Sequence, residues 1–178
     1  MPGLVNAVVA VAPMNTVCQG FTMEKGISFL PGSSWSFHGR EIPYTPYQEK
    51  KFPFGKVLFQ SIRARELSMY DLYLPLVQQP SPDAVIRAEK ITGPVLLISS
   101  KMDKMWPSEL AAERVMQRLQ EHRFPYPYRH LRYDYGSHLF VPIELRRAKF
   151  FKGDRWSNKV PGRQARMDSL TETLEFVS

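Results

Sequence analysis

Two residues suited to proton transfer, Asp103 and His138, each follow a predicted β-strand. Asp103 comes four residues after a strand predicted at 94–99, and His138 comes just after a strand predicted at 128–133. In an open parallel α/β sheet, functional side chains gather in loops beyond the carboxyl ends of neighbouring strands. An aspartate and a histidine placed this way form the carboxylate–imidazole pair that orients a general base. The alternative interpretation is that Asp103 caps a helix and His138 is a turn residue.

The elements that must position these two residues form one βαβ unit at about 94–140. The strands predicted at 5–12 and 94–99 are apolar, which is typical of strands buried on both faces of a parallel sheet. The strand at 128–133 carries charges, as edge strands do. Between the second and third strands, the spacing predicts a helix with Ser108 as N-cap that ends by Arg123. One face of this helix carries Ala111, Val115 and Leu119.

A cap-like insertion of about 14–80 separates the first two strands. Its first part is rich in Gly, Pro and Ser and in aromatic residues, and predicts irregular structure packed by aromatic burial. The aromatic residues of this part include Trp35, Phe37, Tyr44, Tyr47, Phe52 and Phe54. Residues 56–77 allow helix, and Ser81, Pro82 and Asp83 favour a short helix that runs through Ile91. A C-terminal helix is predicted at 162–177, and its apolar face carries Met167, Leu170, Leu174 and Val177.

Composition limits the possible classes of protein. The chain has 178 residues, of which 43% are hydrophobic and 23% charged, so disorder is excluded. The single cysteine, Cys18, allows no disulfide framework, and the spacing of the histidines predicts no metal site. No run reaches the length of a membrane span, and the N-terminus carries no basic region of a secretory signal. We therefore expect a cytoplasmic protein without a membrane partner.

Several segments together resemble one known family. The run Gly93-Pro94-Val95-Leu96-Leu97-Ile98-Ser99-Ser100-Lys101-Met102-Asp103-Lys104-Met105-Trp106-Pro107 and the later Gly136-Ser137-His138 are similar to the C-terminal α/β-hydrolase domain of the acyl-CoA thioester hydrolase and bile acid-CoA:amino acid N-acyltransferase family. Segments 5–12, 34–44 and 166–176 resemble the strand after the nucleophile helix, the cap and the final helix of that domain. The resemblance implies that Asp103 is the triad acid, that His138 is the general base, and that Trp106 and Pro107 shape the acid loop.

The nucleophile does not carry over from this resemblance. The G-x-S-x-G elbow of α/β-hydrolases precedes the strand that 5–12 resembles, and the chain has no such motif. We therefore expect residues 1–178 to form the C-terminal half of an α/β-hydrolase fold, a single partial domain of three parallel strands, flanking helices and a long cap. Cys18 lies a few residues after the first strand and is a less favoured alternative nucleophile.

The family implies acyl-CoA as substrate, with coenzyme A as part of that substrate and no separate cofactor, and a role in acyl-CoA or fatty-acid metabolism. With its triad incomplete, the chain is expected to be inactive alone. The alternative is a non-catalytic interaction protein, which would self-associate through the exposed sheet edge at 5–12.

The net charge of +7 is concentrated late in the chain, and no motif supports a nucleic-acid partner. This basic stretch comprises Arg146, Arg147, Lys149, Lys152, Arg155, Lys159, Arg163 and Arg166. It is either a solvated face or a surface for the phosphates of coenzyme A.

Overall fold

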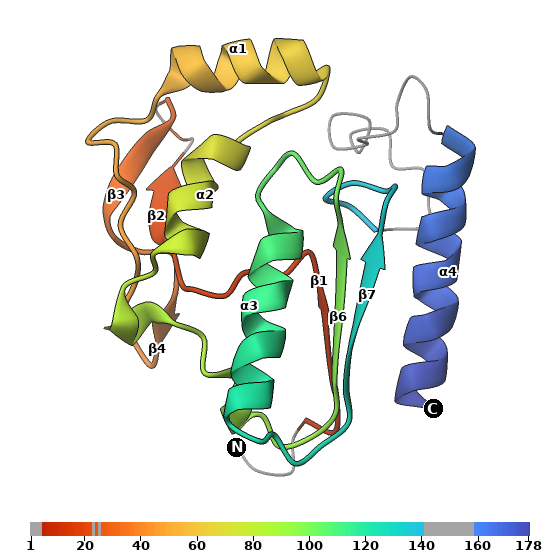
Figure 1. Cartoon of the computed structure of the whole chain (residues 1–178). Coiled ribbons are helices and arrows are strands. Elements are labelled where there is room, and N and C mark those ends of the chain that lie inside the picture. Colours follow the sequence, from red (N-terminus) through yellow and green to blue (C-terminus); the bar gives the residue numbers. More distant parts are fainter. Residues whose placement is uncertain (1–4, 23, 25, 141–158) are drawn as a thin grey trace.

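A three-stranded parallel sheet lies at the centre of the computed structural model, which describes residues 5–22, 24, 26–140 and 159–178 (Figure 1). Its strands are β1 (Val8–Val11), β6 (Val95–Ser100) and β7 (Tyr128–Tyr133), in the order β1-β6-β7. The central strand β6 pairs with both neighbours in parallel. The predicted mixed α/β fold with a parallel sheet is thus confirmed, and β1 is shorter than the strand predicted at 5–12.

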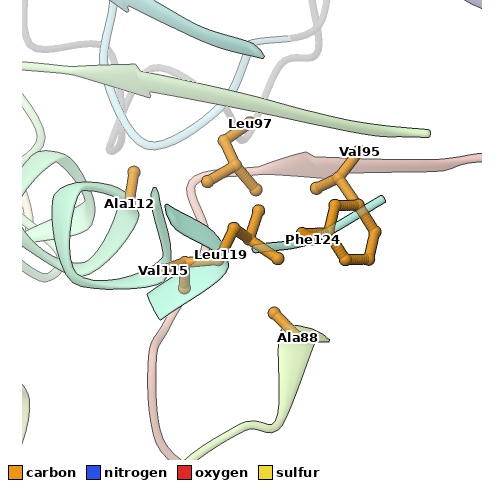
Figure 2. Close-up of a cluster of buried hydrophobic side chains, with 7 residues drawn as sticks. All are labelled: Ala88, Val95, Leu97, Ala112, Val115, Leu119 and Phe124. Atoms are coloured by element: carbon orange, nitrogen blue, oxygen red, sulfur yellow. The ribbon is translucent and has the colours of Figure 1, made fainter. Parts of the chain in front are cut away.

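Helices cover both faces of the sheet. All six residues of β6 are buried, and their side chains alternate between the two faces. Val95 and Leu97 pack against α3 (Ser108–Glu121), whereas Leu96 and Ile98 pack against α4 (Lys159–Val177) and its surroundings. Figure 2 shows the first of these clusters, in which side chains of β6, α3, the 3₁₀ turn η2 (Ala88–Lys90) and Phe124 meet. A strand buried on both faces needs the continuous apolar sequence that predicted it.

The helix between β6 and β7 has the predicted buried face, formed by Ala111, Val115 and Leu119. Its predicted cap is wrong. Pro107 stands at the N-cap position, and Ser108 is the first helical residue, with its buried Oγ unpaired among the described residues. Proline suits this boundary because its ring sets φ near the helical value and it has no N–H to satisfy. The helix ends at Glu121, before Arg123, as predicted.

The cap contains two small hairpins and two helices. The hairpins pair β2 (Gln19–Thr22) with β3 (Ser28–Ser33) and β4 (Ser36–Phe37) with β5 (Arg40–Glu41). The predicted helical stretch at 56–77 is interrupted: α1 (Phe54–Ala64) ends at Arg65, whose backbone is left-handed, and α2 (Tyr70–Gln78) follows. The short helix predicted to run through Ile91 is two 3₁₀ turns, η1 (Pro82–Ala84) and η2, separated by extended backbone at Val85.

Aromatic burial in the cap is only partly as predicted. Tyr47 is buried and stacks on Phe29 with ring centroids 4.4 Å apart. Trp35, Phe37 and Phe54 are instead 69%, 67% and 59% exposed. The cap core is built by Val57 and by the buried side of α2 around Tyr47, so the aromatic residues at the hairpin and helix ends face outward.

The prediction that the C-terminal helix buries its apolar face is also wrong. The side chains of Met167, Leu170, Leu174 and Val177 are all at least 37% exposed. The helix buries Ala165 and Ser169 against the sheet, and Arg129 and Tyr133 of β7 bind Glu172 and Asp168 of α4. Small residues at the contact let the helix approach the strands closely, and these polar pairs fix which side faces them. No helix within the described residues is long and apolar enough to cross a membrane.

Candidate active site

The loop after β6 turns tightly around the carboxylate of Asp103. One oxygen, Oδ1, accepts hydrogen bonds from the backbone N–H groups of Met105, at 2.9 Å, and Trp106, at 3.3 Å. The side chain is 1% exposed. Two backbone donors on one oxygen hold the carboxylate in a fixed orientation. The other oxygen, Oδ2, is thereby directed away from its own loop.

The loop after β7 brings His138 to that second oxygen. The His138 Nδ1 lies 3.1 Å from Asp103 Oδ2, and the imidazole is 15% exposed. Gly136, two residues earlier, has φ +122°, and a Cβ there would lie 2.9 Å from Cζ of Phe140. Glycine is therefore required by both the backbone conformation and the space. Asp134, the first residue after β7, forms an ion pair with Lys101, which ties the two loops together.

Trp106 connects the acid loop to the first strand and to the histidine. Its indole Nε1 donates a hydrogen bond of 3.0 Å to the carbonyl of Ala12, just past β1. Its ring meets the His138 ring edge to face, with centroids 4.1 Å apart. The imidazole is thus held by a carboxylate at one nitrogen and an aromatic surface beside it, and we assign the proton to Nδ1 because an ionised carboxylate only accepts.

The cap is attached to the same loop. The backbone N–H groups of Met69 and Tyr70, at the start of α2, donate hydrogen bonds of 3.0 and 3.1 Å to the carbonyl of Lys104. About one turn further along, α2 contributes Tyr73, whose ring lies 5.5 Å from that of Trp106. Displacement of α2 would therefore be transmitted directly to the acid loop.

Two cavities of different character border this site. One of about 250 Å³ is polar and is lined by Asp103, Ser100, Ser108 and Tyr70 together with acidic residues of α3. The other, of about 210 Å³, lies between the cap and the acid loop. Its lining is mainly apolar and includes Met14, Cys18, Trp35, Tyr47, Tyr73, Ile86 and Trp106. Because Trp106 lines this apolar cavity and also contacts His138, the cavity lies one side chain away from the imidazole.

Cys18, the alternative nucleophile, lines the apolar cavity. Burial raises the pKa of its thiol to about 12, so the thiol is protonated at neutral pH. Reactive cysteines require a thiolate favoured by nearby positive charge, and the apolar lining here has the opposite effect. The structure thus gives Cys18 the character of a partly buried apolar side chain.

A separate contact between a serine and a histidine lies inside the sheet. Ser99 Oγ and His130 Nε2 are 2.7 Å apart, and Ser99 is fully buried. Burial lowers the pKa of His130, which keeps this imidazole neutral. The pair depends on the lateral register between β6 and β7, which no local sequence pattern specifies. We interpret it as an internal hydrogen bond of the sheet.

Other predicted features of the site are located as follows. The basic residues Arg146, Arg147, Lys149, Lys152 and Arg155 lie outside the described residues. Among the described residues, no group of three or more His, Cys, Asp or Glu side chains is arranged to hold a metal ion.

The parallel sheet flanked by helices, with an aspartate and a histidine meeting beyond the ends of adjacent strands, defines a domain of the α/β-hydrolase type. Comparison with known families gives a more specific result. The family described as BAAT / acyl-CoA thioester hydrolase C terminal matches residues 5–144, and the chain belongs to this family. The predicted resemblance is thus confirmed, and the family is one of acyl-CoA thioesterases and related acyltransferases. No curated individual protein matches the chain.

Proposed function

We propose that Asp103 and His138 are the acid and the general base of a triad that acts on acyl-CoA thioesters. The observation that carries this proposal is the contact between His138 Nδ1 and Asp103 Oδ2, at 3.1 Å, with the carboxylate oriented by two backbone N–H groups. This arrangement directs Nε2 of the imidazole away from the acid, where a triad base takes up a proton. Membership in the acyl-CoA thioester hydrolase family supports acyl-CoA as the proposed substrate class.

In the proposed reaction, His138 Nε2 takes the proton of a nucleophile as that nucleophile attacks the thioester carbonyl carbon. The carbon–sulfur bond then breaks, and the proton passes from Nε2 to the sulfur of coenzyme A as it leaves. Water, or an amine in a transferase, attacks the acyl-enzyme with the same base assisting. Asp103 keeps the imidazole in the required tautomer and stabilises the imidazolium that forms.

The nucleophile of this reaction is not evident in the chain. The 178 residues contain no G-x-S-x-G or G-x-C-x-G elbow, and the thiol of Cys18 is protonated and lines an apolar cavity. We therefore propose that this polypeptide alone hydrolyses acyl-CoA only slowly. Water activated directly by His138 would account for the residual reaction, since triads without their nucleophile retain some acceleration.

The apolar cavity beside Trp106 is the proposed subsite for the acyl chain. Its volume of about 210 Å³ and its apolar lining suit a hydrocarbon chain better than a charged group. Each methylene that enters it should strengthen binding about fourfold until the cavity is full. Ile86→Trp should fill the cavity and weaken binding of long-chain acyl-CoA more than of acetyl-CoA. The matched control is Tyr126→Trp, which changes a side chain with the same exposed fraction of 39% outside the cavity.

The catalytic assignment is tested by measuring release of coenzyme A with protein in excess over acyl-CoA. We expect slow hydrolysis that falls to the uncatalysed rate in His138→Ala, with the apo fold unchanged by circular dichroism. Partial recovery with added imidazole would identify the lost group as a base. Equal rates for wild type and His138→Ala would contradict the role of His138. Rapid turnover that depends on His138 would instead contradict the proposed slow reaction of the isolated chain.

The basic stretch after His138 is proposed to attract the phosphates of coenzyme A. Arginine and lysine favour such groups through charge-assisted hydrogen bonds. Replacing Arg146, Arg147 and Lys149 by alanine should weaken binding of coenzyme A itself. Unchanged affinity, measured by calorimetry at low salt, would contradict this proposal.

A non-catalytic role in self-association is a second candidate, favoured by the sheet edge. Among the described residues, β1 pairs only with β6, and Val11 at its end is 47% exposed. An apolar strand edge of this kind favours pairing with another chain. Sedimentation of the purified chain should then show a dimer that Val11→Lys weakens. A monomer at all concentrations would exclude this role.

A further inference from the structure

Helix α1 presents an apolar face to solvent. Phe54, Leu58, Phe59 and Ile62 are 59%, 48%, 67% and 68% exposed, whereas Val57 on the opposite side is buried in the cap core. At 3.6 residues per turn, the four exposed side chains lie within an arc of roughly 140°. An amphipathic helix usually packs its apolar side against the core. In α1 the more apolar side faces water instead.

Cations accompany this apolar face. In projection down the helix axis, Lys56 and Arg63 lie within roughly 60° of Phe59, and both are exposed. Lys50 and Lys51 precede the helix and Arg65 ends it, all of them exposed. The only acids between 49 and 66 are Glu49, which lies 4.0 Å from Lys56, and the buried Glu66. Asp71 of α2 is a further exposed acid beside α1, where it accepts a hydrogen bond from Gln60. The exposed surface around the apolar face thus carries more cations than acids.

The position of α1 leaves this face accessible. Figure 1 shows the helix at the outer end of the cap, remote from the sheet and from β7 and α4. Its length of 11 residues corresponds to about 16 Å. An exposed helix at one end of the molecule can lie flat on a surface without a clash with the rest of the fold.

We propose that α1 is an interfacial helix that binds the surface of an anionic lipid bilayer. Phenylalanine, leucine and isoleucine would enter the boundary between headgroups and acyl chains, while the lysines and arginines contact anionic headgroups. A protein partner would need a groove of matching shape, whereas a bilayer needs only the combination seen here, a convex apolar face bordered by cations. No membrane-spanning segment is required. The proposal is independent of the proposed catalytic function.

The test is co-sedimentation of the full chain with lipid vesicles. We expect binding to vesicles of phosphatidylcholine with phosphatidylserine and much weaker binding to phosphatidylcholine alone. Binding should decrease strongly in about 1 M NaCl, where the screening length falls to roughly 3 Å. Variants of α1 then separate the apolar contribution to vesicle binding from the electrostatic contribution.

The apolar variant is Leu58→Gln, Phe59→Gln and Ile62→Gln, which retains good helix formers and should lower the partition coefficient at least about 100-fold. Its matched control replaces Phe37, Met167 and Leu174 by Gln, at side chains that are 67%, 46% and 58% exposed on β4 and α4. The control should bind as the wild type does.

The charge variant is Lys56→Gln and Arg63→Gln, which should lower binding to anionic vesicles about 25-fold, at about fivefold per cation. Its control is Arg87→Gln with Lys90→Gln, two exposed cations away from α1. The basic stretch after His138 is present in every variant, so any difference between them reports on α1. Circular dichroism and thermal unfolding verify that each variant is folded.

Two results would overturn the proposal. One is binding to anionic vesicles that the apolar variant of α1 leaves unchanged, because attraction would then come from other parts of the chain. The other is no vesicle binding by the wild type. If the wild type in that case forms a dimer that the apolar variant dissociates, the face of α1 is a contact between two copies of the chain.

Discussion

The substitution Asp103→Asn tests how the histidine is held, without removal of a side chain. In the wild type, Asp103 Oδ1 accepts from the N–H groups of Met105 and Trp106, and Oδ2 faces His138 Nδ1. Asparagine must keep its carbonyl oxygen toward the two backbone donors, because its NH₂ group would oppose them. The NH₂ group therefore takes the place of Oδ2 and donates to Nδ1. The imidazole must then carry its proton on Nε2, the wrong nitrogen for a base.

The expected effect of this substitution on stability is small. A hydrogen bond to a charged group contributes about 1 kcal/mol more than a neutral one, and the loss of a buried charge offsets part of this difference. We expect the free energy of unfolding to fall by no more than about 2 kcal/mol. The fold should survive while the tautomer of His138 switches. In a complete triad the same switch reduces turnover about 10⁴-fold.

The assay is long-range proton–nitrogen correlation NMR of the four histidine side chains, with His138 assigned from a His138→Gln spectrum. The wild type should show a proton on Nδ1, and Asp103→Asn should show it on Nε2. The nitrogens of His38, which lies in the β4–β5 turn, provide an internal control that should not change. Identical His138 tautomers in the two proteins would refute the reasoning that Asp103 orients the base.

Three further predictions concern the packing around this site. Gly136→Ala should lower the free energy of unfolding by about 2–3 kcal/mol, because an alanine at φ +122° is strained and its Cβ meets the Phe140 ring; chemical denaturation measures the loss. Arg118 lies 2.5 Å from Glu89 and holds its pKa at about 2, so Arg118→Met should cost roughly 3 kcal/mol at neutral pH. Because the lowered pKa stabilises the folded state above about pH 4.5, that difference should shrink as pH falls toward 2, and an undiminished difference would contradict the ion-pair explanation. Burial lowers the pKa of His130, so the folded state gains stability above about pH 6.5 and loses it at lower pH. His130→Gln should therefore make the melting temperature depend less on pH between about pH 7.5 and 5. An unchanged dependence would count against His130 as its cause.

The sequence predicted the sheet well because its strands differ from the rest of the chain in composition. β6 is buried on both faces and therefore continuously apolar, and β7 agrees with the prediction residue for residue. Asp103 and His138 followed from their places after these strands, without any knowledge of the register. The ends of parallel strands meet at one edge of the sheet, and this rule alone brings the two loops together.

Prediction from the sequence was wrong about which face of a helix is buried where the helix has two candidate faces. In α4 the apolar stripe through Leu170 and Leu174 is exposed, and the smaller Ala165 and Ser169 are buried. Hydrophobicity alone favours the wrong side in this case, because the contact is set by close approach to the sheet and by one ion pair and one hydrogen bond with β7. The same reversal in α1, where Ile62 is exposed, produced the surface proposed to bind a bilayer.

The long-range contacts that hold the acid loop could not have been predicted, because each involves a backbone atom distant in sequence from its partner. The acid loop is held from β1 through the Ala12 carbonyl, from α2 through the Lys104 carbonyl, and by its own turn. Backbone donors and acceptors are present at nearly every residue, so their pairing leaves no sequence signal. Residue types make Asp103 and His138 candidates for an acid and a base, and the surrounding fold determines whether they meet.

This attachment of the acid loop links the cap to the chemistry proposed for His138. Trp106 lines the apolar cavity on one side and contacts the imidazole on the other, and α2 supplies both Tyr73 in that cavity and the N–H donors to the loop. An acyl chain in the cavity would therefore press on the same residues that orient the base. Substitutions that fill the cavity should alter the rate of thioester cleavage as well as binding, because both depend on the position of one indole ring.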